Sequence, residues 1–134
     1  MNNIYDNWEN NVKTKDFSGI RDQGLLPDPR EVEIPGDIDD LLDDYIESTS
    51  SMLEELEAVT LAYESGSYRE ESASAIRRIL HKIKGESSMV SVNDVSELCH
   101  QAEYAFEELS DADKPDMLLR FKDWITIAIE HMAG

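Results

Sequence analysis

Apolar residues recur every three or four positions through most of this chain, and this spacing constrains the fold more than any other feature. The first such run predicts one long amphipathic helix over roughly residues 38–64. Asp37 stands where an N-cap is expected, and the break at 65–67 (Ser-Gly-Ser) ends the helix. The apolar positions of this run are Ile38, Leu41, Leu42, Tyr45, Ile46, Met52, Leu53, Leu56, Val59 and Tyr63.

Three further stretches show the same period. They predict a second helix over about 70–90, a third over about 94–109 with Asn93 as its cap, and a fourth that opens at 113–115 (Asp-Lys-Pro). No stretch alternates apolar and polar residues over a useful length, so we expect an all-α protein. Four amphipathic helices joined by short connectors favour an antiparallel up-down four-helix bundle over residues 37–134.

Residues 1–36 have a different composition. They hold three of the four prolines and three of the six glycines, and they show no sustained apolar period. We interpret them as an irregular, mobile N-terminal arm with a short helical turn around residues 5–12. Trp8 and Phe17 are its large anchors.

The charge of the chain is strongly negative, with 30 acidic against 12 basic residues and a formal net charge of −18. Such a surface repels phosphate backbones and anionic lipid, so we expect neither nucleic-acid nor membrane binding. No uncharged run is long enough for a transmembrane helix or a signal-peptide core. The single Cys99 cannot form an intramolecular disulfide and is expected to pack as a small hydrophobe, which favours a reducing cytoplasm.

A polar cluster on the second predicted helix is the most informative feature. On a helical wheel at about 100° per residue, His81 lies about 140° from the apolar face and therefore points outwards. Arg77, Lys84, Gly85 and Ser88 lie on the same side. Four of the 12 basic residues fall within eight positions around this histidine: Arg77, Arg78, Lys82 and Lys84.

Gly85 disfavours the helix by about 1 kcal/mol relative to alanine, and no turn signal surrounds it. One turn after an outward histidine, it clears room for another surface to approach the imidazole, and Lys84 can hold an anionic group there. These residues suit reversible phosphoryl transfer through a nucleophilic nitrogen. Ser88 is a candidate contact for phosphate or a partner. Arg77 has two interpretations, the same contact or a solvated charge that balances acidic neighbours.

The third predicted helix carries a matching stripe off its apolar face, where Ser96, His100, Glu103 and Glu107 are spaced four, three and four residues apart. If the second and third helices pack antiparallel, this stripe lies next to His81. A carboxylate that accepts a hydrogen bond from one imidazole nitrogen leaves the other nitrogen free to react. Glu103 is the candidate for that role. His100 is a further polar neighbour with a structural or a catalytic part.

The run Leu80-His81-Lys82-Ile83-Lys84-Gly85-Glu86-Ser87-Ser88 resembles the His-x-x-Lys-Gly phosphorylation motif of histidine-containing phosphotransfer (HPt) domains. The later run Leu98-Cys99-His100-Gln101-Ala102-Glu103 is similar to the third-helix segment of the HPt domain at the start of chemotaxis histidine kinases of the CheA type. Together the resemblance covers roughly residues 37–132.

The resemblance implies a role in a two-component phosphorelay. His81 would accept phosphate on its outward nitrogen, and Lys84 would steady the phosphoryl group. Glu103 would orient the imidazole, and Gly85 would admit a response-regulator receiver domain. A histidine kinase catalytic domain would donate the phosphoryl group. The Mg²⁺ and the acceptor aspartate would belong to the receiver, so this chain would hold no cofactor or metal of its own.

Two positions depart from the family's pattern. Glu86 stands where a small residue is usual, and Ser91 stands where a glycine is common. A carboxylate next to Gly85 is expected to repel phosphate or to alter which receiver docks. The resemblance leaves open whether the chain is a stand-alone relay protein or the amino-terminal domain of a CheA-like kinase, in chemotaxis or in another pathway.

Other classes of function compete with phosphotransfer. One is a carboxylate-bridged metal bundle built on His81, His100 and Glu103, but such bundles use inward Glu-x-x-His pairs on two helices, and here one reversed pair points outward. Another is an acidic protein-binding module with an HPt-like bundle that takes no phosphate. A third is an acidic decoy of nucleic acid, although the cations around His81 interrupt the continuous negative surface that a decoy needs.

Overall fold

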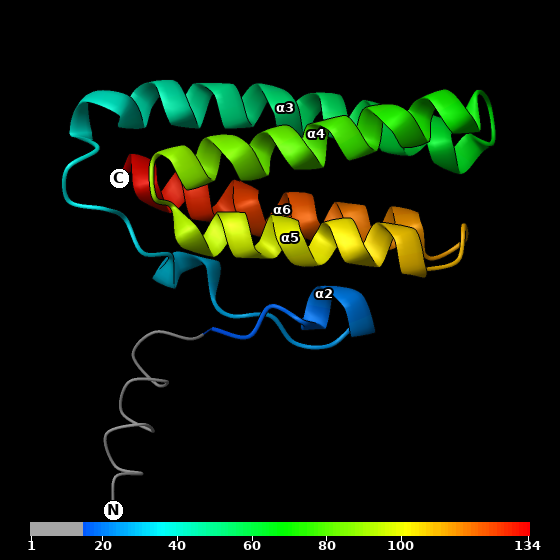
Figure 1. The fold of residues 1–134 in the computed structure, drawn as a ribbon, viewed down its shortest axis with the longest axis horizontal. Helices are drawn as coiled ribbons and strands as arrows, with labels where there is room; N and C mark the ends of the chain where they lie inside the picture. Colours follow the sequence, from blue (N-terminus) through cyan, green and yellow to red (C-terminus); the bar gives the residue numbers. More distant parts are fainter. Residues whose placement is uncertain (1–14) are drawn as a thin grey trace, which may run out of the picture.

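The computed structural model describes residues 15–134 (Figure 1). The described residues form helices and no strand, so the expected all-α class is confirmed. The helical turn expected around residues 5–12 and the Trp8 anchor lie outside the described residues. The elements are the short helix α2 (Gly19–Asp22), the 3-10 helix η1 (Pro29–Glu31) and four long helices, α3 (Asp39–Ser65), α4 (Arg69–Met89), α5 (Asn93–Glu108) and α6 (Lys114–Ala133).

The four long helices pack side by side as a bundle (Figure 1). α3 and α5 each contact both α4 and α6. Hydrogen bonds join Tyr45 of α3 to Ser87 of α4, and Glu55 of α3 to Arg78 of α4, so the paired residues follow opposite orders along the two helices. α4 therefore has a neighbour on each flank, α3 on one side and α5 on the other.

One continuous apolar core holds the helices together. Burial of an aliphatic or aromatic side chain contributes about 1.5–3 kcal/mol. Cys99 is also fully buried, as expected for a small hydrophobe, and this burial raises the pKa of its thiol. None of the helices over residues 15–134 is long and apolar enough to cross a membrane. The largest fully buried side chains belong to Ile20, Leu53, Leu56, Ile76, Ile79, Leu80, Ile83, Leu98, Phe106, Leu118, Phe121 and Ile125.

The helix boundaries agree with the predicted ones to within one or two residues, but two caps differ. Ile38 and Val92 occupy the N-cap positions of α3 and α5, and neither helix has a side-chain cap from the expected Asp37 or Asn93. Both cap residues are apolar and buried. Their burial outweighs the ~1 kcal/mol that a capping hydrogen bond supplies. The expected opening of the fourth helix at 113–115 is confirmed, since α6 begins at Lys114 with Pro115 in its first turn.

The N-terminal segment, residues 15–36, packs against α5 and α6 (Figure 1). Phe17, Ile20 and Val32 are buried in the same core as the bundle. The Phe17 ring meets the Trp124 ring edge-on with centroids 5.3 Å apart, and Trp124 Nε1 donates to the carbonyl oxygen of Pro27 at 2.7 Å. The expectation of a mobile arm is therefore wrong for these residues. Three buried side chains hold the segment although they follow no helical period.

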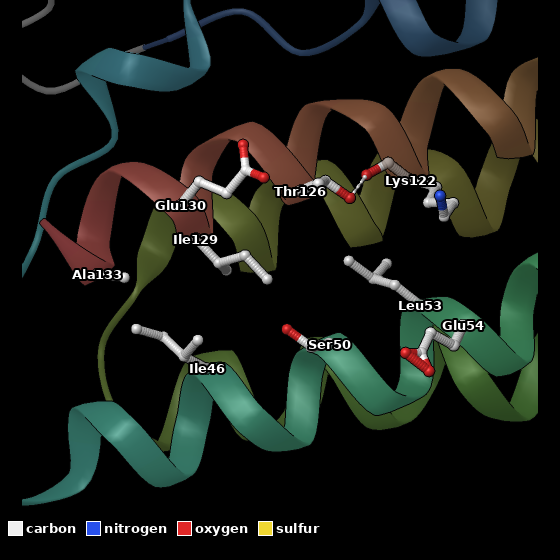
Figure 2. Close-up of a pocket in the computed structure, with 9 residues that line it drawn as sticks. All are labelled: Ile46, Ser50, Leu53, Glu54, Lys122, Thr126, Ile129, Glu130 and Ala133. Carbon is white, nitrogen blue, oxygen red and sulfur yellow. Dashed lines mark hydrogen bonds between the residues drawn. The ribbon is translucent and has the colours of Figure 1, made fainter.

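An open hollow of about 290 Å³ lies between α3 and α6 (Figure 2). Ile46 and Leu53 of α3 face Ile129 of α6 across it. On its α6 side, Thr126 Oγ1 donates to the carbonyl oxygen of Lys122 at 2.8 Å. The lining residues include no histidine or cysteine, and the residues that the sequence singled out lie on α4 and α5 instead.

Candidate functional site

His81 lies on the outer face of α4 with 74% of its side chain exposed. Its neighbours Leu80 and Ile83 are buried in the core, so they fix the rotation of α4 and hold the imidazole in solvent, as the wheel predicts. The Nδ1 atom of His81 is turned toward α5 and lies 3.5 Å from Glu103 Oε2. The other ring nitrogen, Nε2, is thereby left for an external group.

Glu103 is shared between two side chains of α4. Its Oε1 accepts a hydrogen bond from Lys84 Nζ at 2.5 Å, and its Oε2 faces His81 Nδ1. A carboxylate beside Nδ1 favours the tautomer that carries its proton there and leaves the lone pair on Nε2. The structure thus brings His81, Lys84 and Glu103 together. Lys84 and Glu103 are each 27% exposed, so their ion pair is partly shielded from water.

Gly85 leaves open space on α4 beside His81. A methyl group at this position would meet no atom of the described residues within 4 Å. Packing within the described chain therefore does not require a glycine here, although glycine costs about 1 kcal/mol in a helix. The glycine leaves the backbone beside His81 bare, at the position where the sequence predicts that another surface approaches the imidazole.

Glu86 is held on the opposite flank of α4. Its Oε1 accepts a hydrogen bond from Ser48 Oγ of α3 at 2.8 Å, whereas Lys84 and Glu103 meet on the α5 side. The repulsion of phosphate expected from Glu86 is reduced by this position.

Ser91, the second departure from the family's pattern, lies in the turn between α4 and α5. Its φ of 64° falls in the left-handed region, which glycine adopts at little cost. The glycine that the resemblance leads one to expect here would therefore serve the backbone rather than the chemistry. The serine here bears some strain in the same turn.

Two predicted contacts for phosphate or partner are bonded within the chain. Arg77 donates to both carboxylate oxygens of Glu107, at 2.6 and 3.2 Å. This bond holds the pKa of Glu107 below its usual value and raises the pKa of Arg77. The Oγ atoms of Ser88 and Ser96 lie 2.7 Å apart. For Arg77 the geometry favours the second interpretation, a charge that balances an acidic neighbour.

His100 is exposed on α5, and its ring meets the Tyr104 ring edge-on with centroids 5.1 Å apart. Together with Lys84, Glu103 and Glu107, these two rings line a hollow of about 310 Å³ beside the site. No hydrogen bond of residues 15–134 joins His100 to the His81 ring. Sequence reasoning missed Tyr104, whose position four residues after His100 places it on the same helix face.

The part of the chain that the structure describes holds no group of three or more histidine, cysteine, aspartate or glutamate side chains with a geometry suited to a metal ion. At the position where the metal-bundle alternative needs a ligand, Glu103 is hydrogen-bonded to Lys84. The arrangement is that of an exposed nucleophile with a carboxylate and an ammonium beside it.

Comparison with known families identifies the helical bundle that carries these residues. The Hpt domain family model matches residues 40–131, which include all of α4 and α5 and most of α3 and α6. The chain therefore belongs to the Hpt domain family, whose members receive phosphoryl groups from kinases and pass them to response regulators. Residues 15–36 lie outside the match. No curated protein and no solved structure matches the chain.

Proposed function

We propose that this chain accepts a phosphoryl group on Nε2 of His81 and passes it to the aspartate of a response-regulator receiver domain. The observation that carries the proposal is the exposed imidazole whose Nδ1 faces Glu103, with the Lys84 ammonium bound to the same carboxylate. Gly85 supports it, because the backbone beside His81 is open to an approaching domain.

The chemistry is nucleophilic substitution at phosphorus. The Nε2 lone pair attacks the phosphorus of the donor, an N–P bond forms, and the donor's leaving group departs with its electron pair. The imidazole ring becomes cationic in this step, and the Glu103 carboxylate beside Nδ1 stabilises that charge. In the second transfer, a carboxylate oxygen of the receiver attacks the phosphorus, and the electron pair of the N–P bond returns to Nε2.

Lys84 is proposed to balance the charge of the phosphoryl group. Its ammonium is bound to Glu103 beside the imidazole. From there it can donate a charge-assisted hydrogen bond to an oxygen of the phosphoryl group on His81. His100, on the rim of the same hollow, is proposed as a further polar contact. We assign Mg²⁺ and the acceptor aspartate to the receiver, and ATP to the histidine kinase that donates the phosphoryl group.

The finer likeness to CheA-type kinases is also proposed. Its support is the contact between Glu103 and His81, which the His100-Gln101-Ala102-Glu103 pattern leads one to expect. We also propose that all four helices run in an antiparallel up-down order. We further propose that the protein acts in the cytoplasm, where ATP-dependent donors are present, and that it has a role in chemotaxis.

The direct test is labelling with a small-molecule phosphoramidate donor, followed by intact mass before and after mild acid. The unsubstituted protein is expected to gain one acid-labile, alkali-stable phosphate, and His81→Gln is expected to gain none. His131→Gln, which removes another exposed histidine on α6, is the matched control and should label normally. Equal labelling of His81→Gln would overturn the proposal. Failure of the unsubstituted protein to label from phosphoramidate and from histidine kinases would favour the binding-module alternative.

A further inference from the structure

The N-terminal segment reaches the edge of the His81 site. α2 places Arg21 against α5, where its Nη2 donates to Glu108 Oε1 at 2.8 Å. The guanidinium carbon of Arg21 lies 5.3 Å from the centroid of the Tyr104 ring. Tyr104 in turn packs against His100, and both rings line the hollow that borders Lys84. A chain of contacts therefore runs from outside the family match to the candidate site.

α2 is fixed firmly enough to position this arginine. A methyl group on Gly19 would clash with the carbonyl oxygen of Leu25, so the backbone folds back on itself more tightly than any other residue type allows. Arg120 of α6 donates to the carbonyl oxygens of Gly19 at 3.2 Å and of Gly24 at 2.6 Å. Ile20 is wholly buried. Arg21 thus extends from a packed turn.

The position of Tyr104 puts it within reach of any domain that docks on His81. A standard interface buries about 800 Å² on each partner, which corresponds to a disc of roughly 16 Å radius. Tyr104 directly follows Glu103, the residue that contacts the imidazole, and about half of its side chain is exposed. Tyrosine and arginine are among the side chains that most often dominate binding energy in interfaces.

We propose that Tyr104 is a contact for the docking receiver domain and that Arg21 is a positioning residue that holds the Tyr104 ring. The segment 15–36 is then part of the surface that recognises the partner. This inference rests on the proposed function, because the occupant it names is a receiver. The cation–π contact and the Glu108 ion pair keep the ring against His100, so less side-chain freedom is lost when the receiver binds.

The test separates docking from chemistry. Protein labelled with phosphoramidate is mixed with a panel of isolated receiver domains in Mg²⁺, and the loss of phosphohistidine to the fastest acceptor is followed over a range of receiver concentrations. At low receiver concentration, Tyr104→Ala is expected to slow transfer roughly tenfold and Arg21→Ala roughly threefold, which are losses typical of interface side chains. Both deficits should shrink at saturating receiver, since docking is what is weakened. Labelling by phosphoramidate should be unchanged.

Two controls sharpen the result. Arg30→Ala removes another exposed ion pair of the same segment, with Asp28, and should leave transfer unchanged. The double variant Arg21→Ala/Tyr104→Ala should transfer no more slowly than Tyr104→Ala, because Arg21 acts through the ring. All variants should keep the melting temperature of the parent to within a few degrees, as surface substitutions do.

Failure of this inference can be distinguished from failure of the proposed function. Unchanged transfer by Tyr104→Ala would overturn the contact, and additive losses in the double variant would overturn the positioning role of Arg21. A protein that takes no phosphate would instead overturn the proposed function. A labelled protein that no receiver of the panel discharges would leave phosphate acceptance standing and would contradict the receiver contact.

Discussion

Glu103 Oε2 lies 3.5 Å from His81 Nδ1, and this contact joins α5 to the exposed imidazole of α4. The second oxygen of the same carboxylate accepts a hydrogen bond from Lys84. One side chain therefore contacts both the candidate nucleophile and the ammonium that we propose to balance the phosphoryl charge. The negative charge of Glu103 therefore acts on both His81 and Lys84.

The first prediction concerns removal of the negative charge of Glu103. Glu103→Gln keeps the shape of the side chain but removes its charge, so we expect acceptance and transfer of phosphate to slow roughly tenfold, equivalent to about 1.4 kcal/mol. The free energy of unfolding should change by less than about 1 kcal/mol because the ion pair is partly exposed. Rates from phosphoramidate labelling and urea unfolding measure the two effects. Glu107→Gln, on the same helix but bonded to Arg77, is the control; equal slowing in both would contradict the role of Glu103.

Gly85→Ala should separate stability from function. A methyl group has open space there, and alanine favours a helix over glycine by about 1 kcal/mol, so the free energy of unfolding should rise by about that amount. Transfer to a receiver should nevertheless slow, because the methyl group occupies the approach to His81. Ser74→Ala on the exposed face of α4 is the matched control and should change stability without changing transfer. A transfer rate unaffected by Gly85→Ala would remove the reason for a glycine at this position.

The packed state of the N-terminal segment predicts a large effect far from α4. Phe17 is 2% exposed and contacts Trp124, so Phe17→Ala should lower the free energy of unfolding by about 3 kcal/mol in a single cooperative transition. Leu25→Ala, at a side chain that is 94% exposed in the same segment, should have no measurable effect. Urea unfolding followed by circular dichroism checks both. A Phe17→Ala protein as stable as the parent would show that the segment contributes nothing to the core.

Alkaline pH should destabilise the protein through Tyr45. Burial raises the pKa of Tyr45 to about 12, above the 10 of a free tyrosine, and its hydroxyl lies 2.6 Å from Ser87 Oγ. The folded state holds the hydroxyl proton of Tyr45 more tightly than the unfolded state does. The contribution of this proton to the free energy of unfolding is therefore fully present below pH 10 and is lost as the pH rises through 12. The free energy of unfolding should fall by about 1 kcal/mol between pH 10 and pH 11.

Comparison of two phenylalanine variants isolates this effect. Tyr45→Phe should be less stable than the parent at pH 8, since it leaves Ser87 without its partner, but should lose less stability between pH 10 and pH 11. Tyr68→Phe, at an exposed tyrosine, should keep the full alkaline loss. An identical pH profile for Tyr45→Phe and the parent would contradict the assignment.

The four long helices were predictable because their apolar period is local information. The start of α5 shows the limit: Asn93 is a good cap by its chemistry, yet Val92 takes that position because its burial depends on helices distant in sequence. The packing of residues 15–36 was not predictable for the same reason. Phe17 and Ile20 follow no period, and their partners on α6 lie about a hundred residues away.

Part of the site was predictable as well. Given the expected antiparallel packing of the second and third helices of the bundle, the spacing of His81 and Glu103 is enough to predict the contact between the two side chains. The hydrogen bonds between surface side chains could not be predicted from the sequence. Arg77 had several acidic neighbours available, and the structure pairs it with Glu107. Glu86 has a hydroxyl partner on α3 that no motif indicates.

The central claim is that His81 carries phosphate on Nε2, and the nitrogen–phosphorus coupling in protein labelled with ¹⁵N-histidine and then phosphorylated tests it most directly. The structure predicts coupling of phosphorus to a single nitrogen, the Nε2 of His81, with Nδ1 still protonated beside Glu103. Phosphorus coupled to Nδ1, or to either nitrogen of His100 or His131, would contradict it.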